Sequence, residues 1–450
     1  MAQARTRPRA LIIVQNLPVP LDRRVWLECQ ALAAQGFEVS VICPKGPGDP
    51  SFHEIDGIHI YKYAPAPEAR GLLGFAIEFA YSWVRTAWLS LRVRRRHGFD
   101  VIQACNPPDT YWLLALLWRV RGVKFVFDQH DLNPELYLSR FGKPTGIGGR
   151  LQLGGLVQLE RNTYRVADRV VSTNGSYKRV AEHRGKLDPR HVTVVRSGPD
   201  TTVMRPIYPD SSIREGADHV LAYIGIMGPQ DGVENIIAVM DVLVHQRGRQ
   251  GIRAVLLGFG DCLEDLKRES AARGLDDHIV FTGRVGPDQI AQYLSSADLG
   301  LGPDLNTPLN NVSTMNKTME YMAYGLPSVS FDLVETRVSG GDTSIYVPSG
   351  DIEAFADAIE SLLDDPDRRV ALGLAARERV ATELDWKPQA EAYVGVFQEL
   401  LATAPDSAAW PYAARGDVAP RANAPQYVDL EDVSETRRFL RDRTSPLSGN

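Results

Sequence analysis

The sequence predicts an α/β protein with two doubly wound domains that face a central cleft. At 450 residues the chain is too long for one compact core and suits two domains. Short runs rich in valine and isoleucine recur along it and alternate with helical patterns. Continuous apolar strands of this kind are typical of parallel sheets that helices cover on both faces.

The first domain is predicted over residues 1–198. Its strand-like runs are "ALIIVQ", "EVSVIC", "DVIQAC", "KFVFDQ", "RVVST" and "HVTVV". The run "ALIIV" follows arginines near the start, but it is shorter than the core of a signal peptide and fits a first buried strand. We therefore expect no secretion signal here.

The second domain is predicted over residues 219–385, with the runs "HVLAYIG", "RAVLLG", "HIVFTG", "DLGLG", "PSVSF" and "SIYV". A stretch rich in Pro, Ser and charge without a clear period predicts a linker over 199–218. Residues 386–402 are amphipathic at helical spacing and are expected to return toward the first domain. From 403 to 450 the composition predicts a disordered tail, in which "VDLEDVSETRRFLRDR" is a transient helix or a partner motif.

Charge and cysteine content limit the function classes. A formal charge of −6 argues against a nucleic-acid partner, because nucleic-acid-binding domains are usually basic. The four cysteines have neither C-x-x-C spacing nor a nearby histidine pair, so they indicate neither a zinc site nor a disulfide framework. A cytoplasmic location fits best.

One stretch, residues 71–96, combines apolar and aromatic residues with a cluster of arginines at its end. Glu78 and Arg85 would each cost about 2.5–3.5 kcal/mol at a bilayer centre, so we do not expect a membrane span. Two interpretations stay open. The stretch is either an interfacial helix that makes a peripheral contact with the inner face of the cell membrane, or a helix buried in the first domain with a solvated arginine end.

The segment "MNKTMEYMAYGLPSVSFD" places a helix N-terminus just after a predicted strand and its loop. Ligands of parallel sheets bind outside the carboxyl ends of the strands, where such helix N-termini point. The first amides of this helix and the ammonium of Lys317 could hold a phosphate, and the carboxylate of Glu320 could accept hydrogen bonds from a ribose. The alternative is a surface ion pair between Lys317 and Glu320, three residues apart.

This segment resembles the donor-binding segment of glycosyltransferase family 4, which comprises retaining enzymes of the GT-B fold with two Rossmann-like domains. The resemblance extends to "NLPVPLDRRVWLECQALAAQGFEVSVICP", "FDQHDLNPELY", "YIGIMGPQDGVENIIAV", "LLGFGD" and "VFTGRVG", and K-x-x-E-Y-M-A marks a subgroup related to polysaccharide assembly. It implies transfer of a sugar from a UDP- or GDP-sugar to a glycan or lipid-linked acceptor for cell-surface polysaccharide, with no cofactor and no metal.

The resemblance also assigns site residues. Glu320 corresponds to the glutamate that binds the donor ribose, and His130 to a histidine that contacts the donor sugar, so these two are the catalytic candidates. For His130 the alternative is a bond to loop backbone. The other donor-side candidates are Gly225, Arg284, Val285, Met315, Asn316 and Lys317. The acceptor-side candidates are Asn16, Arg23 and Arg24, although the two arginines equally fit a helix start.

Two positions depart from the family pattern. The first glutamate of the family's E-x7-E segment falls on Val312, for which Asp304, Asn310 and Asn311 are the available substitutes. The two cations that clamp the diphosphate in many relatives fall on Ile226 and on Gln230 or Asp231. These departures keep two alternatives open beside the transferase: a GT-B sugar-nucleotide epimerase, and a non-catalytic nucleotide-binding scaffold subunit of a polysaccharide assembly complex.

Overall fold

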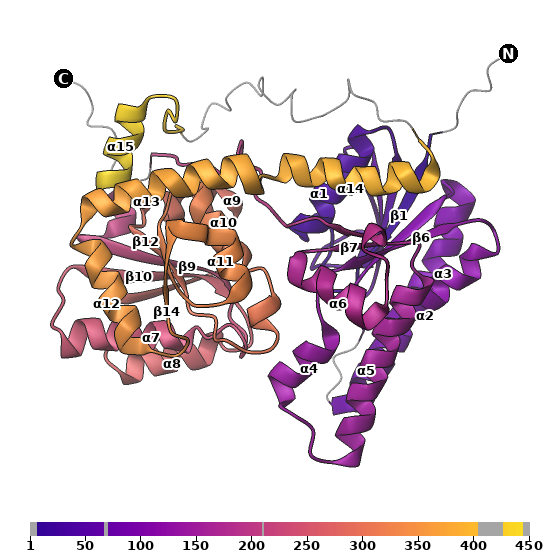
Figure 1. The fold of residues 1–450 in the computed structure, drawn as a ribbon, viewed down its shortest axis with the longest axis horizontal. Helices are drawn as coiled ribbons and strands as arrows, with labels where there is room; N and C mark the ends of the chain where they lie inside the picture. Colours follow the sequence, from indigo (N-terminus) through magenta and orange to yellow (C-terminus); the bar gives the residue numbers. More distant parts are fainter. Residues whose placement is uncertain (1–6, 67–70, 209–210, 404–425, 444–450) are drawn as a thin grey trace. The chain divides into compact units, whose positions relative to one another are not determined.

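The computed structural model describes residues 7–66, 71–208, 211–403 and 426–443, except for the side chains of 71–76 and 211 (Figure 1). It divides into two compact units. Unit 1 comprises Met1–Ser197 with Lys387–Val418, and unit 2 comprises Gly198–Trp386 with Ala419–Asn450. Each has a sheet of parallel strands covered by helices, so the predicted α/β fold class is confirmed.

Unit 1 contains one eight-stranded sheet among its described residues, in the order β3-β4-β2-β1-β5-β6-β7-β8. All pairs are parallel except β3 with β4. The strands are β1 (Arg9–Ile13), β2 (Glu38–Pro44), β3 (Phe52–Ile55), β4 (Ile58–Tyr63), β5 (Val101–Cys105), β6 (Lys124–Gln129), β7 (Arg169–Ser172) and β8 (Val192–Val194). The helices are α1 (Arg23–Ala34), α2 (Gly71–Arg96), α3 (Trp112–Arg119), α4 (Asn133–Phe141), α5 (Ile147–Val166), α6 (Gly175–Gly185) and α14 (Trp386–Leu401).

The core of unit 1 follows from the apolar runs found in the sequence. Strand residues such as Leu11, Ile13 and Phe127 are buried with helix residues such as Trp118 and Leu89. Burying side chains of this size contributes roughly 1.5–3 kcal/mol each. Strands buried on both faces therefore form the central layer that carries the loops at their carboxyl ends.

Unit 2 contains a six-stranded sheet among its described residues, in the order β11-β10-β9-β12-β13-β14, and all its pairs are parallel. The strands are β9 (His219–Ile226), β10 (Ile252–Phe259), β11 (Ile279–Gly283), β12 (Leu299–Gly302), β13 (Ser328–Phe331) and β14 (Ser344–Val347). The helices are α7 (Glu234–Asp241), α8 (Leu263–Ala272), α9 (Pro287–Ser296), α10 (Asn316–Ala323), α11 (Val334–Gly340), α12 (Ile352–Leu363), α13 (Pro366–Arg379) and α15 (Val433–Asp442).

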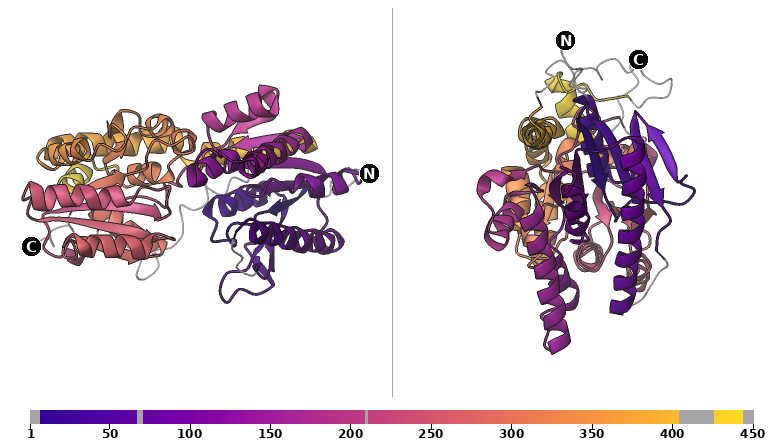
Figure 2. Two further views of the ribbon diagram at one scale, coloured as in Figure 1. Left: turned by 90° about the horizontal axis from the view of Figure 1, so that it is seen from below. Right: turned by 90° about the vertical axis from the view of Figure 1, so that its right-hand side faces the viewer.

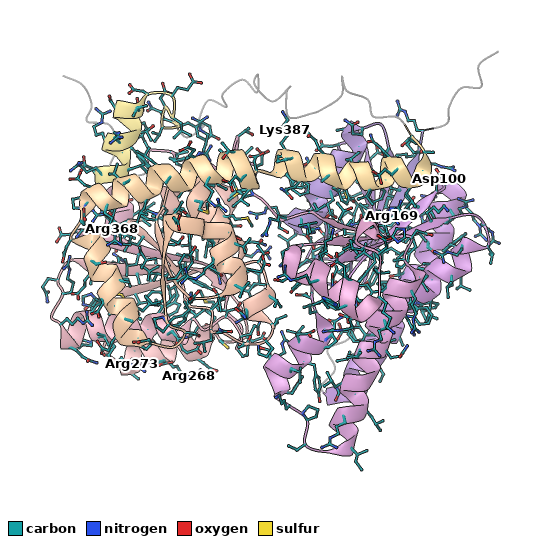
Figure 3. The ribbon with its side chains drawn as sticks, in the orientation of Figure 1. Asp100, Arg169, Arg268, Arg273, Arg368 and Lys387 are labelled. Carbon is teal, nitrogen blue, oxygen red and sulfur yellow. The ribbon has the colours of Figure 1, made fainter. Side chains whose placement is uncertain are left out.

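Helices cover both faces of the unit 2 sheet, as the left view of Figure 2 shows. Alternate residues of β9 point to opposite faces, as a strand requires. Leu221 belongs to a core cluster with residues of α7, α8 and α12, whereas Val220 belongs to one with residues of α9, α10 and α13. The solvent face of α8 carries ion pairs such as Arg273 with Glu269 at 2.9 Å (Figure 3).

The predicted disordered tail differs from the structure over residues 426–443. This segment begins with a bridge between Tyr427 and Ile207 and continues into α15, which packs on α13 (Figure 1). Val428, Phe439 and Leu440 are buried there with Val370. The segment needs few apolar residues to be held in place, because α13 contributes the other apolar side chains of the cluster. The composition of the tail alone does not reveal this contribution.

The predicted linker 199–218 is counted within unit 2, where Trp386 N donates to Pro199 O at 3.0 Å and Thr201 N to an oxygen of Asp385 at 3.0 Å. The predicted C-terminal helix is α14, and its residues from Lys387 onward are counted within unit 1. Among the described residues, no helix combines the length and the apolar character that crossing a bilayer requires.

Candidate functional site

The first group of candidate residues lies at the carboxyl edge of the unit 1 sheet, around the end of β6. Asp128 is fully buried on this strand, and His130 follows it in the loop before α4. The Nε2 atom of His130 lies 2.6 Å from Oδ2 of Asp128. The backbone N–H of His130 donates to the side-chain oxygen of Asn106, which follows β5, at 2.7 Å. The imidazole of His130 is therefore held by a residue of β6, and its backbone N–H by a residue that follows β5.

Arg24 in the first turn of α1 is buried against the same carboxylate. Its guanidinium donates to Oδ1 of Asp128 at 2.9 Å, to the carbonyl of Val195 at 2.9 Å and to the hydroxyl of Ser197 at 3.1 Å. It also lies 3.0 Å from Glu28, one turn further along α1. From the sequence, Arg24 is an acceptor-side candidate, but in the structure its guanidinium is bound to other residues of unit 1. Arg24 is therefore a positioning residue for Asp128.

The electrostatics of this cluster favour a charged histidine. Burial alone would lower the pKa of His130, but the Asp128 carboxylate raises it to about 9. Burial likewise opposes ionisation of Asp128, yet Arg24 and His130 together hold its pKa well below the usual range. With a proton on Nε2 directed at Asp128, His130 cannot also accept a hydrogen bond from Arg24 Nε, which lies 3.2 Å away. That approach is a contact between two cations sharing one carboxylate.

Three further residues complete this network, and sequence reasoning did not select them. The side-chain amide of Gln103 on β5 donates to Glu28 at 2.8 Å and to Asp128 at 3.0 Å. The side-chain oxygen of Gln103 accepts from the hydroxyl of Tyr393 on α14. Glu28 could have been found from its spacing, because it lies four residues after Arg24 on one helix face. Gln103 and Tyr393 carried no local signal.

The ligand-type atoms of Glu28, Cys105, Asp128 and His130 all lie within 4.8 Å of one another. Such a set could in principle bind a metal ion. Here Arg24 already contacts both carboxylates and supplies the compensating positive charge. A metal ion would have to displace a buried guanidinium, so these residues fit an ion-pair network better than a metal site.

The remaining unit 1 candidates lie on the same loop edge. Asn16 is exposed in the loop after β1, and Arg23 is partly buried at the first position of α1. Asp22 caps that helix by accepting from the N–H of Val25 at 3.1 Å. Arg23 therefore lies next to a capped helix start, and Asn16 is the more accessible of the two.

The second group of candidate residues lies at the carboxyl edge of the unit 2 sheet, around α10. The helix begins at Asn316, with Met315 as its extended N-cap residue, close to the predicted start. Lys317 is buried, and its ammonium donates to both oxygens of Asp304 at 2.6 and 2.8 Å. Asp304 lies two residues after the end of β12. The alternative of a surface pair between Lys317 and Glu320 is wrong, because Lys317 is buried and paired with Asp304.

Gly225 at the end of β9 lies against this lysine. A Cβ atom added at Gly225 would stand 3.4 Å from Cε of Lys317 and 2.8 Å from the hydroxyl of Tyr223. The Lys317 ammonium lies 5.1 Å from the centre of the Tyr223 ring, a cation–π distance. Because Gly225 has no side chain, it leaves room for the Lys317 side chain at the end of β9. The Tyr223 ring borders the same space.

Glu320 and Asn316 lie on the same short helix. Asn316 is exposed and Glu320 is partly buried. Since α10 has 3.6 residues per turn, Glu320 lies about one turn after Asn316 along the same side. The structure thus places the carboxylate of Glu320 and the first amides of α10 on one helix, beside the buried Lys317.

Arg284 and Val285 follow β11 on the same edge. Arg284 is exposed, and its guanidinium carbon lies 5.0 Å from the centre of the Phe259 ring at the end of β10. Phe259 is itself 41% exposed. Val285 is partly buried and packs on the core cluster that includes residues of α9 and α10. Arg284 and the exposed Phe259 ring therefore form a cation–π contact at this edge of the sheet.

The substitutes proposed for the family glutamate at Val312 are engaged within the protein. Asp304 binds Lys317 as described. The side-chain amide of Asn310 donates to the carbonyls of Gln230 and Leu305, at 2.8 and 3.0 Å. The side-chain oxygen of Asn311 accepts from the N–H of Val334 at 2.9 Å. These three side chains therefore hold the loop before α10 in place.

Comparisons with known proteins now assign the fold to a family. The family model described as Glycosyltransferase Family 4 matches residues 21–203, and the one described as Glycosyl transferases group 1 matches 218–365. The chain is 30% identical over 312 residues to alpha-maltose-1-phosphate synthase of Mycolicibacterium smegmatis, which covers 64% of this chain and 76% of that protein. The chain belongs to the GT-B glycosyltransferases.

Solved structures agree with this glycosyltransferase fold. Sucrose-phosphate synthase from Thermosynechococcus elongatus superposes with a TM-score of 0.70 at 19% identity, over 88% of this chain and 100% of that one. HepE of Anabaena, solved in complex with UDP-glucose, gives a TM-score of 0.63 at 15% identity, over 88% of this chain and 99% of that one. At this level of identity the likeness supports the fold of the glycosyltransferase and not its substrates.

Proposed function

We propose that this glycosyltransferase is a retaining enzyme of the K-x-x-E-Y-M-A subgroup, which transfers a sugar from a UDP- or GDP-sugar to a glycan or lipid-linked acceptor. The observation that carries the proposal is the group at the carboxyl edge of unit 2, where Lys317, paired with Asp304, lies beside Gly225 at the start of α10. Glu320 lies one turn further along. This edge offers positive charge, backbone amides and a carboxylate within one short segment.

Each part of a nucleotide sugar has a partner at this edge. The diphosphate is held by the amides at the N-terminus of α10, by the remaining donor of Lys317 and by the exposed Arg284. The ribose hydroxyls donate to Glu320, and the base stacks beside Val285 on Phe259. Arg284 and the α10 N-terminus take over the charge of the two cations that relatives carry where this chain has Ile226 and Gln230 or Asp231. On this account the transfer reaction needs no divalent metal and no cofactor.

The reaction then needs no protein nucleophile. The bond between the anomeric carbon and the phosphate oxygen breaks, and the acceptor oxygen bonds to that carbon on the same face. The acceptor proton passes to the leaving diphosphate. His130, as the imidazolium held by Asp128, donates a hydrogen bond to the sugar, while Asn16 and Arg23 contact the acceptor. The protein contributes position and charge.

A thermal-shift screen tests the donor assignment. The full chain and Glu320→Ala are heated with UDP, GDP, ADP and their common sugars, with Glu264→Ala on the exposed face of α8 as the control variant. A ligand present at one hundred times its dissociation constant raises the free energy of unfolding by about 2.7 kcal/mol. We expect one nucleotide class to stabilise the wild type and the control and to lose its effect in Glu320→Ala.

Turnover separates the transferase from its two alternatives. The nucleotide sugar selected by the screen is incubated with candidate glycan and lipid-linked acceptors in the presence of EDTA. The proposal is supported if the nucleoside diphosphate is released and the sugar in the product has the same anomeric configuration as in the donor. A changed nucleotide sugar without a glycan product supports the epimerase, and binding without turnover on any acceptor supports the scaffold.

We place the acceptor at an anionic membrane surface, because α2 presents an exposed apolar face next to arginines. Ile77, Val84, Trp88 and Leu91 are 55%, 60%, 53% and 45% exposed and recur at helical spacing on one side. The opposite side buries Leu89 and Val93 in the core of unit 1. At the end of the helix, a hollow of about 320 Å³ is lined by Trp88, Leu91, Arg92, Arg95 and Arg96. An interfacial helix has this division of faces.

Vesicle binding tests the membrane contact at the cytoplasmic face. Wild type is expected to sediment with phosphatidylglycerol vesicles and not with phosphatidylcholine, and less at high salt because each arginine contributes about 1 kcal/mol near an anionic surface. Trp88→Ala combined with Arg92→Ala should reduce sedimentation, whereas Arg268→Ala on α8 should not. Equal sedimentation of all variants, or none with anionic vesicles, contradicts this assignment.

A further inference from the structure

A cluster of two histidines and a glutamate lies at the amino edge of the unit 1 sheet, away from the strand ends that carry His130. Glu38 is the first residue of β2, His59 is the second residue of β4, and His97 follows the end of α2. Oε1 of Glu38 lies 3.1 Å from Nδ1 of His97 and 3.7 Å from Nε2 of His59. All three side chains are partly buried.

We propose that Glu38, His59 and His97 form a binding site for a divalent transition metal of the zinc class. Ligand atoms about 2.1 Å from a tetrahedral ion lie about 3.3–3.5 Å from one another. The two distances from Glu38 bracket that spacing, and the candidate ligand atoms of all three residues lie within 4.8 Å of one another. Imidazole and carboxylate are the ligands that zinc prefers besides thiolate.

The second nitrogen of each imidazole has a polar neighbour on the side away from Glu38. Nε2 of His97 lies 2.9 Å from the hydroxyl of Tyr61, which directs Nδ1 toward Glu38. Nδ1 of His59 lies 3.5 Å from Glu54, an ion-pair distance without a hydrogen bond, while Nε2 faces Glu38. Metal-bound histidines usually give their second nitrogen to such a partner. A water would occupy the fourth position.

The two rings stack, with centroids 3.9 Å apart and planes inclined at 24°. For both lone pairs to reach one ion, the rings must fan further apart. His59 makes this movement more easily, because its outer contact with Glu54 is longer than the one between His97 and Tyr61. A bound ion would link the end of α2 to β2 and β4, so its role is structural and separate from sugar transfer.

Metal binding by the full chain tests the proposal. Protein without a histidine tag is stripped with a chelator, desalted and titrated with Zn²⁺ by calorimetry, and with Co²⁺ by visible absorption. We expect one tight site per chain, a cobalt spectrum typical of tetrahedral nitrogen and oxygen ligands, and a Tm that rises with Zn²⁺. His59→Gln and His97→Gln should each weaken binding at least tenfold, whereas His53→Gln, an exposed histidine on β3, should not.

Circular dichroism and the metal-free Tm establish that each variant is folded. Unchanged zinc affinity in folded His59→Gln and His97→Gln contradicts the proposal, as does the absence of tight binding to the wild type. A thiolate-to-cobalt charge-transfer band would show a cysteine ligand, which the cluster of Glu38, His59 and His97 lacks, and would also overturn the proposal.

An independent observation concerns the C-terminal segment, residues 426–443, and the end of α10. The carbonyls at the end of α10 accept hydrogen bonds from two arginines, of which Arg377 is partly buried and Arg443 is buried. Arg377 donates to the carbonyl of Ala323 at 2.9 Å, and Arg443 donates to those of Tyr324 and Gly325, the first at 3.1 Å. Arg443 is 2% exposed. A helix end that is buried without such donors is strongly disfavoured.

We infer that Arg443 is a positioning residue for the donor helix, an inference that rests on the proposed function of α10. The helix has only 8 residues, so its two ends are close together and a shift at Gly325 is transmitted to Lys317 and Glu320. The contact also fixes α15, whose Phe439 and Leu440 are buried with Val370 of α13. Removing the guanidinium takes this buried donor away from both carbonyls.

Two readouts test this role. Hydrogen exchange of the peptide covering 314–325, measured without ligand, should be at least tenfold faster in Arg443→Ala than in wild type or in Arg441→Ala, a matched arginine on the exposed face of α15. Guanidinium added to Arg443→Ala should slow it again. The affinity for the nucleotide found in the screen should fall about tenfold in the same variant.

The two readouts distinguish two failures. If α10 exchanges equally in Arg443→Ala and wild type, the positioning role is wrong. If exchange accelerates as expected but no nucleotide binds to wild type, the donor assignment is wrong and the positioning of α10 by Arg443 stands. Accelerated exchange with unchanged nucleotide affinity contradicts the link to the donor site.

Discussion

The Nε2 atom of His130 lies 2.6 Å from Oδ2 of Asp128, and this contact favours the charged form of His130. Because Asp128 raises the pKa of His130 to about 9, above the value of about 6.5 for an unfolded histidine, the interaction stabilises the folded state. Its contribution is complete below about pH 6.5 and is lost as the pH rises through about 9.

Unfolding experiments between pH 6 and 10 measure this contribution. The stability advantage of wild type over His130→Asn should shrink as the pH rises through that window. His183→Asn, at an exposed histidine on α6, is the matched control variant. An advantage that is constant with pH contradicts a charged His130. If His130 serves the reaction as an imidazolium, kcat should fall over the same window.

The Lys317–Asp304 pair predicts a strong and non-additive effect on stability. Lys317→Met leaves the Asp304 carboxylate buried without its partner, and such a loss costs about 3–5 kcal/mol. Asp304→Asn removes the negative charge of the same ion pair. The double variant should be clearly more stable than the sum of the single effects predicts, as urea unfolding of all four proteins will measure. Additive losses would show that the two side chains do not interact.

Much of this architecture follows from local sequence. The apolar runs predict most of the parallel strands, and the start of α10 falls within a residue or two of the expected position. The partner of Lys317 could not be predicted, because Asp304 lies thirteen residues earlier and meets it only when β12 and α10 pack. The sequence indicates a transient helix or a partner motif where α15 lies, but its packing on α13 could not be predicted for the same reason. Its apolar side chains form a cluster only together with residues of α13.

Gly225 predicts a steric test of the donor edge. In Gly225→Ala the added methyl group would meet the Tyr223 hydroxyl at 2.8 Å and press on Lys317. Displacement of these side chains should cost about 1–3 kcal/mol and weaken nucleotide binding. Gly154→Ala on α5 is the matched control, because a Cβ atom there meets no atom within 4 Å. Calorimetry with the selected nucleotide measures both variants, and equal affinities would remove Gly225 from the site.

The central claim is that Glu320 holds the ribose of the donor, and a binding cycle tests it most directly. The dissociation constants of wild type and Glu320→Gln are measured with the selected nucleoside diphosphate and with its 2′,3′-dideoxy analogue. A hydrogen bond to a charged group contributes about 1.5–3 kcal/mol, so the substitution should weaken the ribonucleotide roughly tenfold to a hundredfold and leave the dideoxy analogue almost unaffected. Equal losses with both nucleotides would show that Glu320 acts elsewhere and would contradict the account.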